Sequence, residues 1–306
     1  MPIEKPTVLI LGAGASRPYG FPVGIGLRDA VCERLLEPVV QIFFKQLGFG
    51  RDGARKFADA VRHSAYPSVD TFLEAYPKYL EIGKMAIAVV LLPFEDHDKL
   101  FSPRVRSQSH WYELLINKMD PGGTGWNRNR LTVVTFNYDR SFEHYFITVL
   151  QQRAGVSAKR AATMFRRVEV IHVHGQLGSY PHLGSDPVTY GARTDKDPFG
   201  AAARAIRVVS DAGDDLAPFK RAKKKLLEAQ RAYFLGFGFA DVSVGRLGVF
   251  GPEERHWDVG ALDGTSKGVP ERDWARICRD LFSGSMNPRR FRRSVSEFLR
   301  ERAALR

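Results

Sequence analysis

The stretch Thr7-Val8-Leu9-Ile10-Leu11-Gly12-Ala13-Gly14-Ala15-Ser16 joins an apolar run to a glycine-rich turn. Such a run predicts a buried strand, and the turn predicts the start of a helix. Two later stretches have the same form: Leu131–Thr135 precedes Phe136-Asn137-Tyr138-Asp139, and Val168–Ile171 precedes His172-Val173-His174-Gly175. Because ligands bind at the carboxyl ends of parallel strands, we expect these three polar clusters to meet at one nucleotide site.

The rest of the chain predicts an α/β protein with a large helical insertion. Residues 38–127 contain few β-branched runs and several punctuating prolines, which favours helices. Arg231–Leu235 is a further strand that follows a basic helix over Pro218–Gln230. Strands that alternate with helices indicate a Rossmann-like parallel sheet with helices on both faces. We therefore expect a single domain over 1–306 that ends in an amphipathic helix over 288–305.

The composition of the 306-residue chain narrows the class of protein. Its 44% hydrophobic fraction suffices for a large core. The longest apolar run, from Met85 to Pro93, is too short to span a bilayer. We recognise no signal peptide and expect a cytoplasmic protein. The two cysteines, Cys32 and Cys278, are too few for a zinc module of four thiolates or for a disulfide framework.

The formal net charge of +12 includes two basic clusters, Lys220–Lys225 and Arg289–Arg293. A basic surface attracts nucleic acid and phosphorylated small molecules. Two interpretations stay open for these clusters: solvated helix faces, or a docking surface for a nucleic acid or an acidic partner.

The glycine-rich turn has a structural and a functional interpretation. Gly12-Ala13-Gly14 lies where backbone N–H groups can approach a pyrophosphate at a helix N-terminus. The dehydrogenase fingerprint G-x-G-x-x-G, however, requires a glycine where Arg17 stands. The turn alone therefore fits a nucleotide site and an ordinary structural turn equally well.

The other two clusters are also ambiguous when each is taken alone. Asn137 and Asp139 are placed to cap a helix over Asp139–Gln152. His174 ends a strand, where a histidine either serves a ligand or satisfies a backbone group. His172 lies further inside the same strand and is better suited to a structural role.

Taken together, the motifs resemble the sirtuin superfamily, whose Gly-Ala-Gly-x-Ser, Gly-Ile-Pro, Asn-x-Asp, His-Gly and Gly-Thr-Ser elements occur in this order. The resemblance covers about residues 5–30 and 130–250 and leaves out the insertion and the tail. The stretches that carry it are Gly12–Ser16, Gly20-Phe21-Pro22, Asn137-Tyr138-Asp139, His174-Gly175 and Gly236-Phe237-Gly238.

The chain departs from the protein-deacylating sirtuins at several positions. It has no four-cysteine zinc module after the His-Gly motif, Val23-Gly24-Ile25 replaces Asp-Phe-Arg, and Gly238 stands where a serine is common. The chain is therefore more similar to the sirtuin-like effectors of bacterial antiphage defence, which hydrolyse NAD. Ser68–Leu73 also resembles a segment that recurs in these effectors.

The resemblance implies an NAD glycohydrolase that uses NAD as its substrate and no metal. Asn137 would hold the nicotinamide ribose or position the attacking water, and Asp139 would orient this loop or the nicotinamide amide. His174 would act as general base. Asp241 is equally suited to cap a helix. The residues implied for NAD binding are Gly12, Ala13, Gly14, Ser16, Phe21, Gly175, Gly236, Gly238 and Asp241.

The resemblance also implies control by assembly, because unrestrained NAD cleavage would harm the host. The insertion and the tail helix carry apolar stripes, so we expect a homo-oligomer. Related effectors work with a HerA-like ATPase or an Argonaute-like protein, and we expect no membrane partner. Two alternatives stay open: a zinc-free deacylase or ADP-ribosyltransferase, and a non-catalytic nucleotide-sensing or nucleic-acid-binding scaffold. The broken fingerprint disfavours a dehydrogenase.

Overall fold

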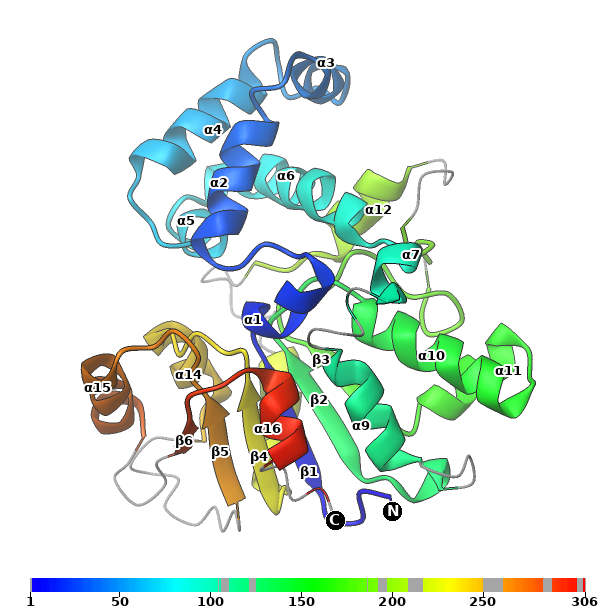
Figure 1. Cartoon of the computed structure of the whole chain (residues 1–306). Helices are drawn as coiled ribbons and strands as arrows, with labels where there is room; N and C mark the ends of the chain where they lie inside the picture. The colour runs from blue at the N-terminus through cyan, green and yellow to red at the C-terminus, as the bar shows by residue number, and fades with distance from the viewer. Residues whose placement is uncertain are drawn as a thin grey trace.

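The computed structural model describes residues 2–103, 105, 110–120, 125–185, 187–191, 197–208, 217–249, 261–282, 288–301 and 305. Within them, a parallel sheet has the strand order β3-β2-β1-β4-β5-β6 (Figure 1). This is the strand order of a dinucleotide-binding Rossmann fold. The strands are β1 (Thr7–Leu11), β2 (Leu131–Thr135), β3 (Glu169–His172), β4 (Arg231–Leu235), β5 (Ala261–Thr265) and β6 (Arg289–Phe291).

Helices cover both faces of the sheet, as the sequence predicts (Figure 1). The α-helices are α1 (Ala13–Ser16), α2 (Ile25–Arg34), α3 (Pro38–Gln46), α4 (Gly53–His63), α5 (Val69–Ala75), α6 (Leu80–Leu91), α7 (His97–Leu100), α9 (Trp111–Met119), α10 (Ser141–Ala154), α11 (Ala158–Phe165), α12 (Pro198–Ala205), α13 (Ala217–Leu227), α14 (Asp241–Leu247), α15 (Glu271–Leu281) and α16 (Val295–Glu301). Single 3₁₀ turns are η1 (Arg17–Tyr19), η2 (Pro77–Tyr79), η3 (Leu92–Phe94) and η4 (Trp126–Arg128).

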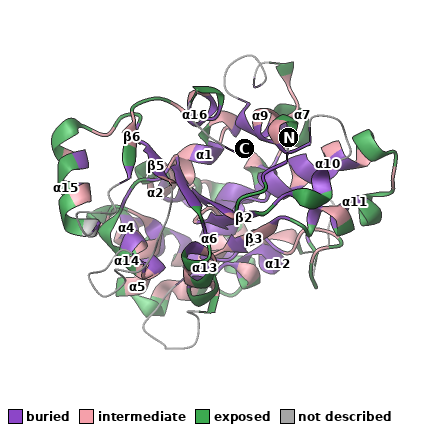
Figure 2. Cartoon of the chain, turned by 90° about the horizontal axis from the view of Figure 1, so that it is seen from below, coloured by how far each residue is buried: buried purple, intermediate pink, exposed green. Residues whose placement is uncertain are grey.

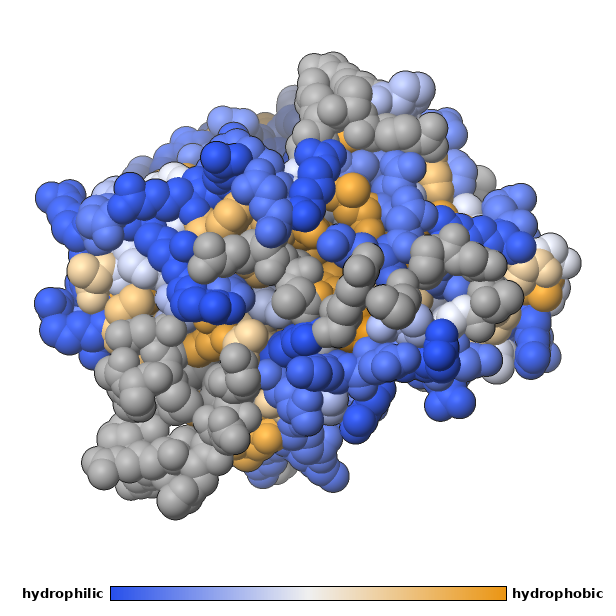
Figure 3. Space-filling model, turned by 60° about the horizontal axis from the view of Figure 1, so that its bottom comes forward, coloured by the Kyte–Doolittle hydropathy of each residue, from blue (hydrophilic) through white to orange (hydrophobic). Residues whose placement is uncertain are grey.

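Two hydrophobic clusters lie on opposite faces of the sheet because successive strand residues point to opposite sides. In β1, Leu9 and Leu11 join the cluster that contains side chains of α9, α10 and α16. Val8 and Ile10 join the cluster that contains side chains of α13, α14 and α15. Figure 2 shows buried residues along the sheet and the inner sides of the helices. The face in Figure 3 is mainly hydrophilic, with small apolar areas.

The stretch 38–127, predicted to be mainly helical, is helical in its described residues, and its helix α9 packs on the sheet. Its described residues form helices and connecting segments and no strand. Its helices α3 to α6 stand over the carboxyl ends of the strands, above α1 in Figure 1. Its helix α6 packs against α12, which follows β3 in the chain. The insertion is therefore placed next to the site predicted at these strand ends.

The predicted tail helix over 288–305 is wrong at its start. Arg289–Phe291 form the edge strand β6, and the guanidinium of Arg289 donates to both oxygens of the β5 residue Asp263 at 2.8 and 2.9 Å. The helix begins only at Val295. Residues 302–304, and all but Gly125 of the loop predicted over 121–125, lie outside the described residues. Among the helices described, none has the length and apolar composition needed to cross a membrane.

Candidate active site

The turn after β1 packs directly on the turn after β4, at the point where the strand order reverses. The Gly12 N–H donates to the Leu235 carbonyl at 3.1 Å, and the Gly14 N–H donates to the Gly236 carbonyl at 2.9 Å. A Cβ atom on Gly14 would lie 2.8 Å from that Gly236 oxygen. These glycines thus allow two backbones to approach, and both N–H groups already have partners within the protein.

This close approach predicts that Gly236 tolerates no side chain. Its φ is +59°, and an added Cβ would lie 2.2 Å from the Ala15 nitrogen. We expect Gly236→Ala to lower the free energy of unfolding by about 1–3 kcal/mol in urea titrations. Gly238→Ala is the matched control, because a Cβ there meets nothing within 4 Å. Equal stability of the two variants would show that the two turns do not constrain each other.

Three polar side chains from the first two motifs form one hydrogen-bonded cluster. Ser16 donates its hydroxyl to Asp139 Oδ2 at 2.6 Å. Asn137 Nδ2 donates to the Gly12 carbonyl and to Ser16 Oγ, both at 3.0 Å. A carbonyl oxygen can only accept, so the Asn137 amide must turn its nitrogen toward Gly12. Its oxygen Oδ1 is then the atom left to accept a hydrogen bond from a ligand.

Asp139 is buried, and both of its oxygens bond within the protein. Oδ2 accepts from Ser16, and Oδ1 accepts from the Ser141 N–H at 3.1 Å. Burial raises the pKa of Asp139, and the hydrogen bonds from Ser16 and Ser141 oppose this. The geometry suits a residue that positions Ser16 and, through it, Asn137.

A cavity of about 130 Å³ opens beside this cluster. Asp70 of the insertion also lines it. The cavity is smaller than the roughly 300–1,000 Å³ of typical ligand pockets, so in this conformation it admits only part of a dinucleotide. The residues predicted for catalysis or NAD binding that line it are Ala13, Ser16, Phe21, Asn137 and Asp139.

His174 lies next to this cavity rather than in its wall. Its ring contacts Phe136 and Tyr138, with centroids 5.6 and 6.3 Å away, and both of these residues line the cavity. Its Nδ1 is buried and has no hydrogen-bond partner among the described residues. Burial lowers the pKa of His174, with Asp70 raising it and Arg246 lowering it. The imidazole is therefore neutral at pH 7 and able to accept a proton.

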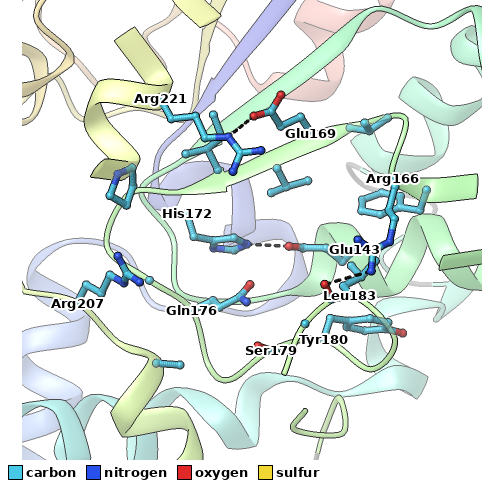
Figure 4. Close-up of a pocket in the computed structure, with 18 of the residues that line it drawn as sticks. Glu143, Arg166, Glu169, His172, Gln176, Ser179, Tyr180, Leu183, Arg207 and Arg221 are labelled. Atoms are coloured by element: carbon cyan, nitrogen blue, oxygen red, sulfur yellow. Dashed lines mark hydrogen bonds and ion pairs between the residues drawn. The ribbon is translucent and has the colours of Figure 1, made fainter. Parts of the chain in front are cut away.

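His172 has a structural role, as its position in the strand predicts. Its Nδ1 lies 3.0 Å from the Asn137 carbonyl oxygen, and its Nε2 lies 2.7 Å from Glu143 Oε1 (Figure 4). Burial lowers the pKa of His172, but Glu143 and the Asn137 carbonyl outweigh this and raise it overall. Because a carbonyl oxygen can only accept, Nδ1 carries a proton and donates to Asn137, and the raised pKa favours a second proton on Nε2, shared with Glu143. The ring thereby holds the backbone of Asn137 in place.

The remaining predicted residues do not line the cavity. A Cβ on Gly175, whose φ is +70°, would lie 2.1 Å from the Ala205 carbonyl oxygen. A glycine is therefore needed here to leave room for the end of α12. Gly238 is exposed. Asp241 begins α14 and pairs with Arg276 at 3.6 Å, with 65% of its side chain exposed. For these three residues, a role in NAD binding stays a prediction.

Helix α5 of the insertion contacts the residues around the cavity, although the sequence assigned no site residue to this helix. Tyr138 donates its hydroxyl to Asp70, and Arg246 of α14 donates to both carboxylate oxygens of Glu74 at 2.7 and 3.0 Å. Ser68 caps α5 in a reciprocal pair with Thr71, which fixes where the helix begins. The only signal in the sequence was the resemblance of Ser68–Leu73 to a segment of the antiphage effectors.

Comparisons with known proteins do not assign the chain to a family, since no family model and no curated protein matches it. In the part of the chain that the structure describes, no group of three or more His, Cys, Asp or Glu side chains is arranged to hold a metal ion. The class of protein defined by fold and site is thus a Rossmann-like α/β protein with a small cavity at the carboxyl ends of β1 and β2, beside a hydrogen-bonded polar cluster.

Proposed function

We propose that the protein is an NAD glycohydrolase, which cleaves NAD to nicotinamide and ADP-ribose. The observation that carries this proposal is the cluster of Ser16, Asn137 and Asp139. Residues more than 120 positions apart meet in it through hydrogen bonds of 2.6–3.0 Å, and together they line a cavity. The cavity lies at the carboxyl ends of β1 and β2, the edge of the sheet at which Rossmann folds bind dinucleotides. The sirtuin-like order of the motifs supports the same substrate.

The reaction breaks the bond between the nicotinamide nitrogen and the anomeric carbon of the ribose. Nicotinamide leaves with the electron pair, and a water molecule forms the new bond to the carbon, through a transition state with oxocarbenium character. In the proposed mechanism, Asn137 Oδ1 accepts a hydrogen bond from the ribose or from the water. The neutral imidazole of His174 takes the proton that the water or a ribose hydroxyl releases. Asp139 and His172 position Asn137 and do not touch the substrate.

The products of NAD turnover test this proposal. Purified protein is incubated with NAD, and nicotinamide, ADP-ribose and cyclic products are resolved by chromatography and mass spectrometry. Free nicotinamide and ADP-ribose, formed without an acceptor peptide, are the expected result. Formation of O-acyl-ADP-ribose only when an acylated peptide is present would favour the zinc-free deacylase instead. Salt-dependent DNA binding without any NAD turnover would favour the scaffold.

Helix α5 lies over the cavity, and this arrangement fits an NAD-cleaving activity that stays latent until α5 moves. Asp70 and Glu74 tie α5 to Tyr138 and to α14, and the space enclosed is about 130 Å³. Entry of a whole dinucleotide therefore requires α5 to move. We include control by assembly in the proposal, because α3 of the same insertion exposes Val39 and Ile42. Light scattering that detects only monomers, with and without NAD, would contradict this part.

We expect Glu74→Ala to raise basal NAD turnover about tenfold, because α5 loses the two charge-assisted hydrogen bonds that join Glu74 to Arg246 of α14. Initial rates of nicotinamide release measure the effect. Glu81→Ala, at an exposed position on α6, removes the same charge from the insertion and should leave the rate unchanged. A lower rate in Glu74→Ala would mean that the closed form is the active one.

A further inference from the structure

A second and larger cavity lies along the edge strand β3, and it is separate from the cavity of the candidate active site. Its volume is about 800 Å³, within the range of pockets that enclose small-molecule ligands. Figure 4 shows it between β3, the loop that carries Gln176, Ser179 and Tyr180, and the first turn of α13, which carries Arg221. None of the proposed NAD-cleavage steps uses this space.

The cavity wall is rich in arginine. Its described lining contains Arg166, Arg204, Arg207 and Arg221, against the carboxylates of Glu143 and Glu169. Glu169 already accepts from Arg221 and lies 3.1 Å from Lys225, so its charge is compensated within the protein. Arg204 in turn pairs with Asp197 at 3.3 Å, which leaves the charge of Arg166 to favour an anion.

Arg166 presents a positive charge that no carboxylate balances. It donates to the carbonyl oxygens of His182 and Leu183 at 3.0 and 3.4 Å. These partners are neutral, and within the described part of the chain no carboxylate lies at ion-pair distance from Arg166. A guanidinium held by backbone carbonyls at the rim of a cavity is well placed to bind a phosphate.

Glu143 provides an independent sign of a missing ligand. Only 4% of its side chain is exposed, and Oε1 accepts from His172. Its other oxygen, Oε2, is buried and has no hydrogen-bond donor among the described residues. A buried carboxylate oxygen without a donor costs free energy. Since Glu143 lines the cavity, a ligand with a hydroxyl group can supply that donor.

We propose that this cavity binds a sugar phosphate, free or as part of a nucleotide. The phosphate lies against Arg166, and a sugar hydroxyl donates to Glu143 Oε2, which Figure 4 shows on the same side of the cavity. His172 connects Glu143 to the Asn137 carbonyl, so three hydrogen bonds in series join the ligand to Asn137. Binding here does not require NAD cleavage, and its test stands apart from that of the proposed function.

Isothermal titration calorimetry on the full chain tests the proposal with ribose 5-phosphate, AMP and inorganic phosphate. We expect ribose 5-phosphate or AMP to bind more tightly than inorganic phosphate, and the tighter of the two identifies the source of the sugar phosphate. Arg166→Gln should weaken this binding about 10- to 100-fold. Arg279→Gln removes the same charge from an exposed position on α15, at the opposite edge of the sheet, and should leave affinity within about twofold.

Glu143→Gln tests the sugar contact separately. It should abolish the preference for ribose 5-phosphate over inorganic phosphate while phosphate binding persists, and far-ultraviolet circular dichroism checks that the variant folds. Absence of heat with ribose 5-phosphate and with AMP at millimolar concentration would overturn the proposal. Equal weakening by Arg166→Gln and Arg279→Gln would also overturn it, because this is the behaviour of non-specific attraction to a basic protein.

Discussion

His174→Ala and Asn137→Ala should each lower NAD cleavage by about 10²–10⁴-fold, the usual loss when a general base or an equivalent positioned group is removed. His174 is neutral at pH 7 because burial lowers its pKa, and it lies against two residues that line the cavity. Asn137 turns its amide oxygen away from Gly12, where a ribose or a water can use it. Initial rates of nicotinamide release at saturating NAD measure both effects.

Cys32→Ser is the matched control for these two variants, since no step uses a thiol and Cys32 is buried on α2. It should leave NAD turnover unchanged. Thermal unfolding of all three proteins separates lost chemistry from lost structure. NAD turnover within a few-fold of the parent in both His174→Ala and Asn137→Ala would remove the mechanistic basis of the proposed function.

Glu95→Ala should lower the free energy of unfolding by about 3–5 kcal/mol, because it leaves the charge of Arg140 buried without its partner. Both side chains are fully buried. Arg140 donates from its backbone N–H at 3.0 Å and from Nε at 3.1 Å to Glu95 Oε1, and it also bonds the Val188 carbonyl. Arg140 therefore joins the start of α10, beside Asp139, to Glu95 and to the loop that contains Val188.

Glu37→Ala is the control for this stability effect, since Glu37 pairs with Arg34 at a position where both side chains are more than 40% exposed. An exposed pair contributes about 0–1 kcal/mol, and urea titrations of the two variants should differ accordingly. A loss below about 1 kcal/mol in Glu95→Ala would show that water reaches Arg140 and that the pair is not the buried anchor described here.

The sequence predicted β1 to β4, including the edge strand β3, but it did not predict β5 or β6. β1, β2 and β4 have the bounds predicted from their apolar runs, because central strands of a parallel sheet are buried on both faces and contain continuous apolar residues. β5 contains an aspartate and a glycine, and β6 reads Arg-Arg-Phe. These two strands are held by pairing with their neighbours and by the Arg289–Asp263 contact, and neither leaves a local pattern.

For the site, the sequence by itself determined which residues follow the strands, and hence that Gly12–Ser16, Asn137 and Asp139 meet at one edge of the sheet. Only the tertiary structure decided that the N–H groups of Gly12 and Gly14 are already occupied. It also placed α5 over the cavity, through contacts such as that between Arg246 and Glu74. The physical reason is range: strand and turn patterns are local, whereas these contacts join segments up to 172 positions apart and depend on how the insertion packs.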